Sequence, residues 1–312
     1  MLYIAKCPLR VSLVGGGTDL EAFVQKYGKG SVISFPSTLY VYVSIHDNNR
    51  NQYILNYSKN EEVDELYEVQ NTPARIVLGH YKTGPITVSF LSDIISTGSG
   101  LGSSSAYMIA LTKAATLYKK EQLTEFEICR EALNLERKFN PETGYQDSYG
   151  CGVGGFKRIT FTKDRRPTFS FLDSDFLRDN FDMALYYTNK TRNSTNILKT
   201  MNIDKCLPLL TMVDDLEDAI ENEDVEKFLD IFNKGWEVKK TTSPLIAGDE
   251  YFQTMDKEFQ DNKDVLGVKL CGAGGGGYFL ALCKKGRVPK QINGSKAIPI
   301  GVNETGVVGQ RF

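Results

Sequence analysis

The segment "SGLGSSSAYMIALTKAATLYKK", residues 99–120, decides the fold, because a turn rich in glycine and serine runs directly into a helical pattern. Gly98, Gly100 and Gly102 let backbone N–H groups approach an anion closely, since no Cβ stands in the way. The helix that the pattern predicts from about Ser104 directs the positive end of its dipole to the same point. The segment therefore predicts a cradle for phosphate groups.

Two better-known phosphate motifs do not fit the glycine segments of this chain. A dinucleotide fold needs G-x-G-x-x-G, whereas "GGGTDL" (residues 15–20) lacks the last glycine and "GSGLGS" (residues 98–103) has the wrong spacing. A Walker P-loop needs a lysine after its final glycine, where this chain has Ser103. The charge of a nucleotide must then be met by Mg²⁺ and by residues elsewhere in the sequence.

The composition is that of an ordinary globular protein, with 312 residues, 41% of them hydrophobic and 24% charged. A net charge of −2 argues against partners such as nucleic acid or an anionic membrane. No apolar run has the length of a signal peptide or of a membrane span, which favours a cytoplasmic protein. The six cysteines are scattered and there are two histidines, so we expect reduced, partly buried thiols and no structural zinc.

The order of predicted elements indicates an α+β protein of two domains. Near-alternating apolar residues predict strands in both halves of the chain, separated in the second half by helical patterns that include residues 207–240. A charged, proline-containing stretch at residues 162–175 is the expected boundary, giving domains 1–175 and 176–312. Strands are predicted at residues 3–7, 10–15, 31–36, 39–45, 52–58, 85–94, 181–189, 265–271, 277–283, 297–302 and 306–312.

Two carboxylates are candidates for chemistry. Residues 124–140 predict a helix that begins with a Thr124–Glu127 capping box. A carboxylate on an apolar face is costly unless it is paired or binds a cation. Glu136 is therefore a metal ligand, part of a buried salt bridge, or a residue at a helix end that frays at "ERKFN" (residues 136–140). Asp147 lies in a glycine-rich stretch and is either a carboxylate held in a cleft or a turn residue. The apolar face comprises Phe126, Cys129, Ala132, Leu133 and Glu136.

Three glycine motifs in order along the chain resemble those of the GHMP kinase superfamily. They are "PLRVSLVGGGTDL" (residues 8–20), "GSGLGSSSA" (residues 98–106) and "KLCGAGGGGYFL" (residues 269–280). Within the superfamily, the motif sequences are most similar to those of the D-glycero-D-manno-heptose 7-phosphate kinases, and fucose kinases share the "GG-x-TD" pattern. The resemblance implies an ATP-binding N-terminal domain of ribosomal protein S5 domain 2-like type, a ferredoxin-like C-terminal domain, and an active site in the cleft between them.

The resemblance also implies roles for individual residues. Asp147 would be the catalytic base, Arg10 would lie near the reacting hydroxyl, and Mg²⁺ would bind Ser104 and Glu136. The phosphates of ATP would be bound by Gly98, Ser99, Gly100, Leu101, Gly102, Ser103, Ser104 and Ser105. The substrate would be bound by Gly16, Gly17, Thr18, Asp19, Asp147, Gly274 and Gly275.

The implied reaction transfers the γ-phosphoryl group of ATP to the anomeric hydroxyl of D-glycero-D-manno-heptose 7-phosphate. The product, a 1,7-bisphosphate, would serve the synthesis of nucleotide-activated heptose for capsule, lipopolysaccharide or S-layer glycans. Lys190 and Arg192, in "TNKTRNSTN" (residues 188–196), are expected to bind the substrate's phosphate, the alternative being a solvated turn. A kinase of an unphosphorylated sugar and a non-catalytic sensor of sugar and nucleotide remain alternatives, and a homodimer is left open.

Overall fold

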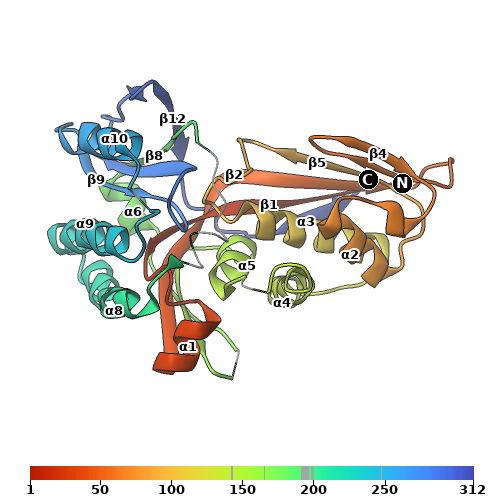
Figure 1. The fold of residues 1–312 in the computed structure, drawn as a ribbon, viewed down its shortest axis with the longest axis horizontal. Helices are drawn as coiled ribbons and strands as arrows, with labels where there is room; N and C mark the ends of the chain where they lie inside the picture. The colour runs from red at the N-terminus through yellow and green to blue at the C-terminus, as the bar shows by residue number, and fades with distance from the viewer. Residues whose placement is uncertain (142, 165, 191–196, 198–199, 247) are drawn as a thin grey trace.

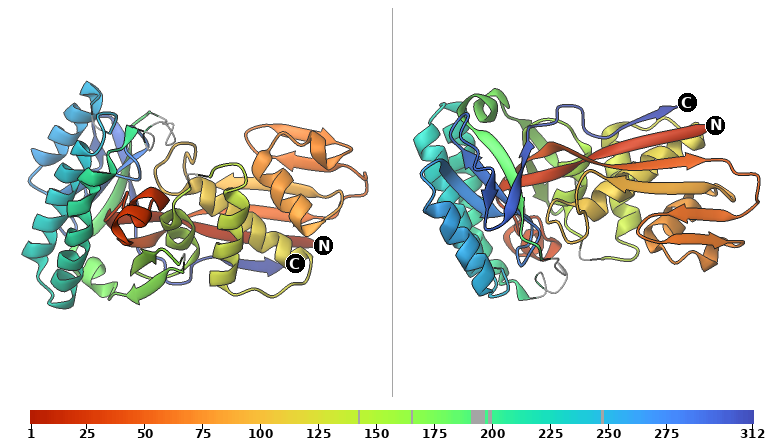
Figure 2. Two further views of the ribbon diagram at one scale, coloured as in Figure 1. Left: turned by 60° about the horizontal axis from the view of Figure 1, so that its bottom comes forward. Right: turned by 90° about the horizontal axis from the view of Figure 1, so that it is seen from above.

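A computed structural model describes residues 1–312 except 142, 165, 191–196, 198–199 and 247. The molecule is elongated, with a large sheet and its helices at one end and a smaller sheet with its helices at the other (Figure 1). Both chain termini lie side by side at the far end of the large sheet (Figures 1 and 2). The α+β fold of two parts that the sequence predicts is therefore observed.

The large sheet follows the order β13-β1-β2-β5-β3-β4, and β6 pairs with β2 and β7 beside this path. Its pairs are antiparallel except β3 with β5, which run parallel. The strands of this sheet are β1 (Leu2–Val14), β2 (Lys29–His46), β3 (Tyr53–Asn56), β4 (Asn60–Val63), β5 (Thr87–Ser92), β6 (Lys157–Thr162), β7 (Thr168–Phe171) and β13 (Val308–Arg311).

β1 and β2 are each a single long strand where the sequence predicts two short ones. The predicted breaks, at residues 8–9 and 37–38, fall inside the strands, each at or next to a proline, and the β1–β2 register shifts between Pro8 and Arg10. Such an irregularity lets a strand carry a proline without ending, because the missing N–H falls where the ladder is already interrupted. The continuous strands carry the N-terminal motif from the large sheet to the boundary with the second part.

The helices of the first part cover one face of the large sheet (Figure 1). α4 begins with the predicted capping box, in which the Thr124 hydroxyl accepts from the Glu127 N–H. Of its predicted apolar face, Phe126 is partly exposed and packs against Phe169, while the other four side chains are buried. These helices are α1 (Glu21–Tyr27), α2 (Thr72–Tyr81), α3 (Ser103–Tyr118), α4 (Glu125–Glu136) and α5 (Tyr145–Gly152), with the 3₁₀ turn η1 (Leu66–Glu68).

The second part has a sheet in the order β11-β12-β8-β10-β9, with helices stacked along one side (Figure 2). The last strand, β13, pairs with β1 in the large sheet, so the predicted second domain, 176–312, does not keep its final strand. The elements are α6 (Asp175–Asn180), β8 (Asp182–Tyr187), η2 (Ile203–Cys206), α8 (Leu207–Glu221), α9 (Val225–Thr241), α10 (Glu250–Gln260), β9 (Val265–Leu270), β10 (Tyr278–Cys283), β11 (Gln291–Ile292) and β12 (Ser295–Ile300).

One cluster of buried apolar side chains continues from the large sheet into the second part. It joins Val14 and Phe35 of the long strands to Val213 of α8 and Phe232 of α9. All six cysteines are buried and free of disulfides, as the sequence predicts. No helix in the described part of the chain is long and apolar enough to cross a membrane. The shared core fixes the two parts around the cavity that lies between them.

Candidate active site

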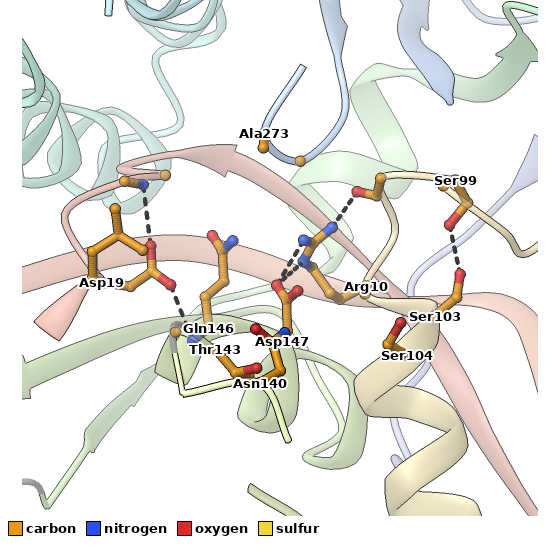
Figure 3. A pocket seen from close by; sticks show the side chains of 18 of the residues that line it. Arg10, Asp19, Ser99, Ser103, Ser104, Asn140, Thr143, Gln146, Asp147 and Ala273 are labelled. Carbon is orange, nitrogen blue, oxygen red and sulfur yellow. Dashed lines mark hydrogen bonds and ion pairs between the residues drawn. The ribbon is translucent and has the colours of Figure 1, made fainter. Parts of the chain in front are cut away.

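A cavity of about 340 Å³ lies where the motifs of the two parts meet. Figure 3 shows Asp19 towards one end, Ser99, Ser103 and Ser104 at the other, and Arg10 with Asp147 between them. The second part contributes Lys239 of α9 and the loop residues Gly272 and Ala273. The cleft between two domains that the resemblance implies is therefore present.

The first end of the cavity is formed by the glycine-serine loop and the start of α3. Gly98, Gly100 and Gly102 have φ values of +64°, +81° and +73°, the left-handed region that glycine adopts without strain. Gly102 precedes the first residue of α3, and no side chain in the described part of the chain caps that helix. The first N–H groups of α3 therefore remain available to an anion, as a phosphate cradle requires.

Serine hydroxyls hold this loop in shape. The Ser99 hydroxyl lies 2.5 Å from that of Ser103 and accepts from the Leu101 N–H at 3.2 Å. Both serines line the cavity, whereas Leu101 is completely buried in the core and serves to anchor the loop. Ser104 lies on the first turn of α3 and is exposed in the cavity. Of the predicted phosphate-binding residues, Leu101 and Ser105 do not line the cavity.

An ion pair between Arg10 and Asp147 occupies the middle of the cavity. Nη2 and Nε of Arg10 donate to Oδ1 of Asp147 at 2.7 and 3.1 Å, and Nη1 donates to the carbonyl of Gly100. Burial is the largest single influence and opposes the charge of Arg10, but Asp147, with Cys151 and Cys271, outweighs it and raises the Arg10 pKa. Arg10 therefore ties a carboxylate on the first turn of α5 to the phosphate loop.

Glu136 lies at the C-terminal end of α4 and is 2% exposed, although it lines the cavity. Its Oε2 accepts a 2.6 Å hydrogen bond from the hydroxyl of Ser105, a neutral partner. Burial is the main cause that raises the pKa of Glu136 to about 7, and the Asp147 carboxylate acts in the same direction. A cation in the cavity would relieve this cost.

The opposite end of the cavity contains Asp19, which is 6% exposed. Its carboxylate accepts from the N–H groups of Gly17 at 3.1 Å and Gln146 at 3.4 Å. A Cβ on Gly144 would lie 2.3 Å from Oδ2 of Asp19, so glycine is required for this approach to the start of α5. Burial and then Asp147 raise the pKa of Asp19 above its ordinary value.

The other residues of the N-terminal motif divide into two groups. Gly16 and Gly17, which are predicted to bind the substrate, line the cavity. Thr18 does not, because it is completely buried and its hydroxyl lies 2.8 Å from the carbonyls of Gly15 and Ser31, which share its one proton. Thr18 thus supports the loop instead of facing a ligand.

The C-terminal glycine loop meets the phosphate loop directly. Tyr278 donates its N–H to the Ser99 carbonyl at 3.1 Å, and a Cβ on Gly277 would lie 2.1 Å from that oxygen. The predicted substrate contacts Gly274 and Gly275 do not line the cavity; they pack close to Ile246 and Ile197. Gly272 and Ala273 line it in their place, because the loop presents its first turn to the cavity.

Lys190, the first member of the predicted phosphate clamp, lies outside the lining of the cavity. The Lys190 ammonium group is paired with Asp249 at 2.5 Å. Arg192, the second member of the clamp, falls outside the residues that the structure describes.

Sequence reasoning missed five polar residues of the described lining: Ser96, Asn140, Thr143, Gln146 and Lys239. A signal existed for Lys239. It follows Phe232 and Trp236 along the buried face of α9, as Glu136 follows the apolar residues of α4. In both helices a charged residue lies at the helical spacing of the buried apolar residues and so falls on the same face as they do. Gln146 and Asn140 had no comparable signal.

Comparison with known proteins gives a family match for one segment of the chain and a relative over most of its length. Residues 71–155 match the GHMP kinases N-terminal domain. A D-glycero-alpha-D-manno-heptose 7-phosphate kinase of Campylobacter jejuni is 27% identical over 297 residues, covering 87% of this chain and 86% of the relative. An L-fucokinase/L-fucose-1-P guanylyltransferase of Bacteroides fragilis is 29% identical over 61% of this chain, which spans 21% of that protein.

Solved structures extend the likeness to the whole chain. The structure of a D-glycero-D-manno-heptose 1-phosphate kinase from Bacteroides thetaiotaomicron has a TM-score of 0.81 at 22% identity, covering 99% of both chains. At this identity the likeness shows the fold. Together these findings confirm the predicted resemblance, the GHMP kinase fold and the prediction of a kinase.

Proposed function

We propose that this chain, a GHMP kinase by its N-terminal domain and its fold, transfers the γ-phosphoryl group of ATP to the anomeric hydroxyl of a sugar. The observation that carries the proposal is the position of the Arg10–Asp147 pair. It lies between a main-chain phosphate cradle and the polar end that contains Asp19. A base between donor and acceptor is what an in-line transfer requires.

The cradle would hold the β- and γ-phosphates of ATP. The left-handed glycines Gly98, Gly100 and Gly102 bring N–H groups to the phosphate oxygens, and the uncapped start of α3 directs its dipole at them. The hydroxyls of Ser99 and Ser103 keep the loop in this conformation. The phosphate charge is thus met by main-chain donors that need no reorganisation as the reaction proceeds.

Asp147 would accept the proton of the attacking hydroxyl. The hydroxyl oxygen forms a bond to the γ-phosphorus, the bond to the β–γ bridging oxygen breaks, and ADP leaves. Two nitrogens of Arg10 on the same oxygen, Oδ1, hold the carboxylate in place and leave its other oxygen to face the sugar. Positioned bases of this kind contribute roughly 10²–10⁴-fold to a rate.

Mg²⁺ fits the residues at the phosphate end. Within the described residues no three acidic, histidine or cysteine side chains form a complete metal site, and Mg²⁺ commonly takes only one or two protein oxygens beside phosphates and water. Glu136 is buried, and its hydrogen-bond partner is neutral; Ser104 exposes its hydroxyl. These two residues would hold Mg²⁺, which supplies positive charge to the phosphate oxygens when bound.

D-glycero-D-manno-heptose 7-phosphate is the proposed acceptor, with the 1,7-bisphosphate as product for nucleotide-activated heptose synthesis. The Campylobacter jejuni relative, which covers 87% of this chain, supports this choice. A kinase of an unphosphorylated sugar is the second candidate. It is favoured by the likeness to the Bacteroides fragilis fucokinase and by Lys190, which pairs with Asp249 outside the cavity.

The test is ADP release with Mg-ATP across D-glycero-D-manno-heptose 7-phosphate, sedoheptulose 7-phosphate, mannose, fucose and galactose. Turnover with the heptose phosphate alone is the expected result. Turnover with a free sugar alone would replace the acceptor but keep the sugar kinase. A protein that binds ATP in calorimetry yet turns over none of these sugars would contradict the proposed function and favour a sensor.

A further inference from the structure

Three polar side chains that the proposed mechanism does not use meet at the acceptor end of the cavity: Gln146 and Lys239 line the cavity, and Ser12 lines a smaller pocket beside it. Ser12, Gln146 and Lys239 come from β1, α5 and α9, and they converge on Gly16. A Cβ on Gly16 would lie 3.8 Å from Nζ of Lys239, 3.9 Å from Oγ of Ser12 and 4.0 Å from Oε1 of Gln146. The lack of a side chain at position 16 thus leaves open the space that these groups surround.

All three side chains are buried, and two of them have unused hydrogen-bonding capacity. Ser12, Gln146 and Lys239 are 5%, 6% and 8% exposed. In the described part of the chain, Oγ of Ser12 and Oε1 of Gln146 have no hydrogen-bond partner. A buried polar atom without a partner costs about 1–3 kcal/mol, so such atoms are rarely left unbonded without a function. They indicate a polar ligand at this position.

Lys239 connects the two parts of the molecule at this point. It lies on the buried face of α9 with Trp236, and its Nζ donates to the carbonyl of Gly16 at 3.2 Å. An ammonium group has three N–H donors, and the bond to Gly16 uses one of them. Asp19 is close enough for Lys239 to stabilise its carboxylate. A donor and an acceptor therefore flank the same space.

The hydrogen-bond donors and acceptors around Gly16 distinguish between a sugar hydroxyl and a phosphate as the ligand. A sugar hydroxyl both donates and accepts, so it can donate to Asp19 or to Oε1 of Gln146 and accept from Lys239. A phosphate dianion only accepts, and it would stand beside the Asp19 carboxylate and an amide oxygen that has no proton to offer. The groups around Gly16 match hydroxyls and oppose a phosphate.

We propose that Lys239, with Gln146 and Ser12, forms a subsite for hydroxyl groups of the acceptor sugar, and that it does not bind the sugar's phosphate. Lys239 is then a specificity-determining residue contributed by the second part of the chain. This inference rests on the proposed sugar kinase and adds to it. It assigns the recognition of the sugar hydroxyls to Gln146 and Lys239, which lie outside the three glycine motifs, and to Ser12 within the first of them.

The test measures KM and kcat of the full chain with D-glycero-D-manno-heptose 7-phosphate and with the same heptose lacking the phosphate. Lys239→Met should raise KM for both sugars by the same factor, about 10- to 100-fold, because a hydrogen bond to a charged group is worth about 1.5–3 kcal/mol. KM for ATP should change less than twofold. Lys234→Met is the matched control, since Lys234 lies on the same helix in an exposed pair with Asp230.

Three outcomes would overturn the inference. Unchanged KM values in Lys239→Met would remove the residue from the site, and a rise for the phosphorylated sugar alone would make it a phosphate ligand. If Lys239→Met does not fold, Gln146→Leu must show the same parallel rise, and its absence is equally decisive. Failure of the wild-type protein to phosphorylate any sugar would instead contradict the proposed function, and the subsite with it.

Discussion

The two ends of the cavity are built by different means. The phosphate end is made of main chain, with three left-handed glycines and the uncapped start of α3. The acceptor end is made of side chains, namely Asp19, Gln146 and Lys239, which come from separate elements. A phosphate presents the same oxygens in every ATP, so fixed N–H groups suffice for it, whereas sugars differ and are distinguished by side chains.

This difference determines what a single sequence reveals. The phosphate end is encoded within residues 98–104, because its glycines act on their own neighbours in the chain. The acceptor end brings Lys239 to Gly16 from 223 residues away, and no local pattern records such a contact. Substitutions at each end test whether the two ends are as separate in function as they are in construction.

The largest expected effect is at Asp147, which stands between the two ends. Asp147→Asn keeps the shape of the side chain but removes the proton acceptor, so kcat should fall by about 10²–10⁴-fold. Calorimetry should show ATP and sugar binding within a few-fold of wild type, because neither end is altered. Turnover within tenfold of wild type would exclude Asp147 as the base.

The next effect tests the main-chain construction of the phosphate end. In Gly102→Ala the new Cβ would lie 2.9 Å from Sγ of Cys151 and 3.1 Å from Cγ of Arg10, at a φ of +73°. The clash displaces Arg10, and a 1 Å displacement at a reacting centre can cost about 10²-fold. We expect kcat/KM for ATP to fall by roughly 10- to 100-fold.

Gly84→Ala is the control for this substitution. Gly84 has the same φ of +73°, but a Cβ there would meet nothing within 4 Å. Both variants should lose about 1–2 kcal/mol of stability from the left-handed conformation. If both also lost the same activity, strain alone would explain the result, and the close packing at Gly102 would have no specific role.

A third prediction concerns the buried charge at the phosphate end. The Glu136 pKa of about 7 lies above the ordinary value of 4.5, so the folded protein binds this proton more tightly than the unfolded chain. Stability from this group is therefore present below pH 4.5 and is lost as the pH rises through 7. Without Mg²⁺ and ATP, wild type should lose roughly 2–3 kcal/mol relative to Glu136→Gln between pH 5 and pH 8.

Urea unfolding of both proteins at a series of pH values measures this difference. The neutral amide of Glu136→Gln removes the titration but can retain the bond to Ser105. Equal pH dependence of the two proteins would show that Glu136 is already compensated in the folded state. The need for a cation beside it would then lose its physical basis.

The smallest effect is expected at Lys190, beyond the acceptor end. Its ion pair with Asp249 is exposed, and such pairs are worth about 0–1 kcal/mol. Lys190→Ala should therefore change KM for heptose 7-phosphate less than about twofold. A tenfold increase would extend the acceptor end to residue 190 and restore the phosphate clamp that the sequence predicts.

Features that depend on contacts between nearby residues could be predicted from the sequence, and features that depend on distant contacts could not. The α3 start, the capping box at Thr124 and the buried position of Glu136 were predictable, because each depends on residues within a few turns. The pairing of β13 with β1 was not, since it joins the two ends of the chain. The structural role of Thr18 was equally hidden, because its hydroxyl bonds to Ser31 on another element.

The central claim is phosphoryl transfer to an anomeric hydroxyl, and phosphorus NMR of the product tests it most directly. The protein is incubated with Mg-ATP and D-glycero-D-manno-heptose 7-phosphate, and the new resonance is assigned through its coupling to the sugar protons. We expect a phosphate coupled to the anomeric proton, formed in equal amount with ADP. A phosphate on another hydroxyl, or inorganic phosphate with unchanged sugar, would contradict it.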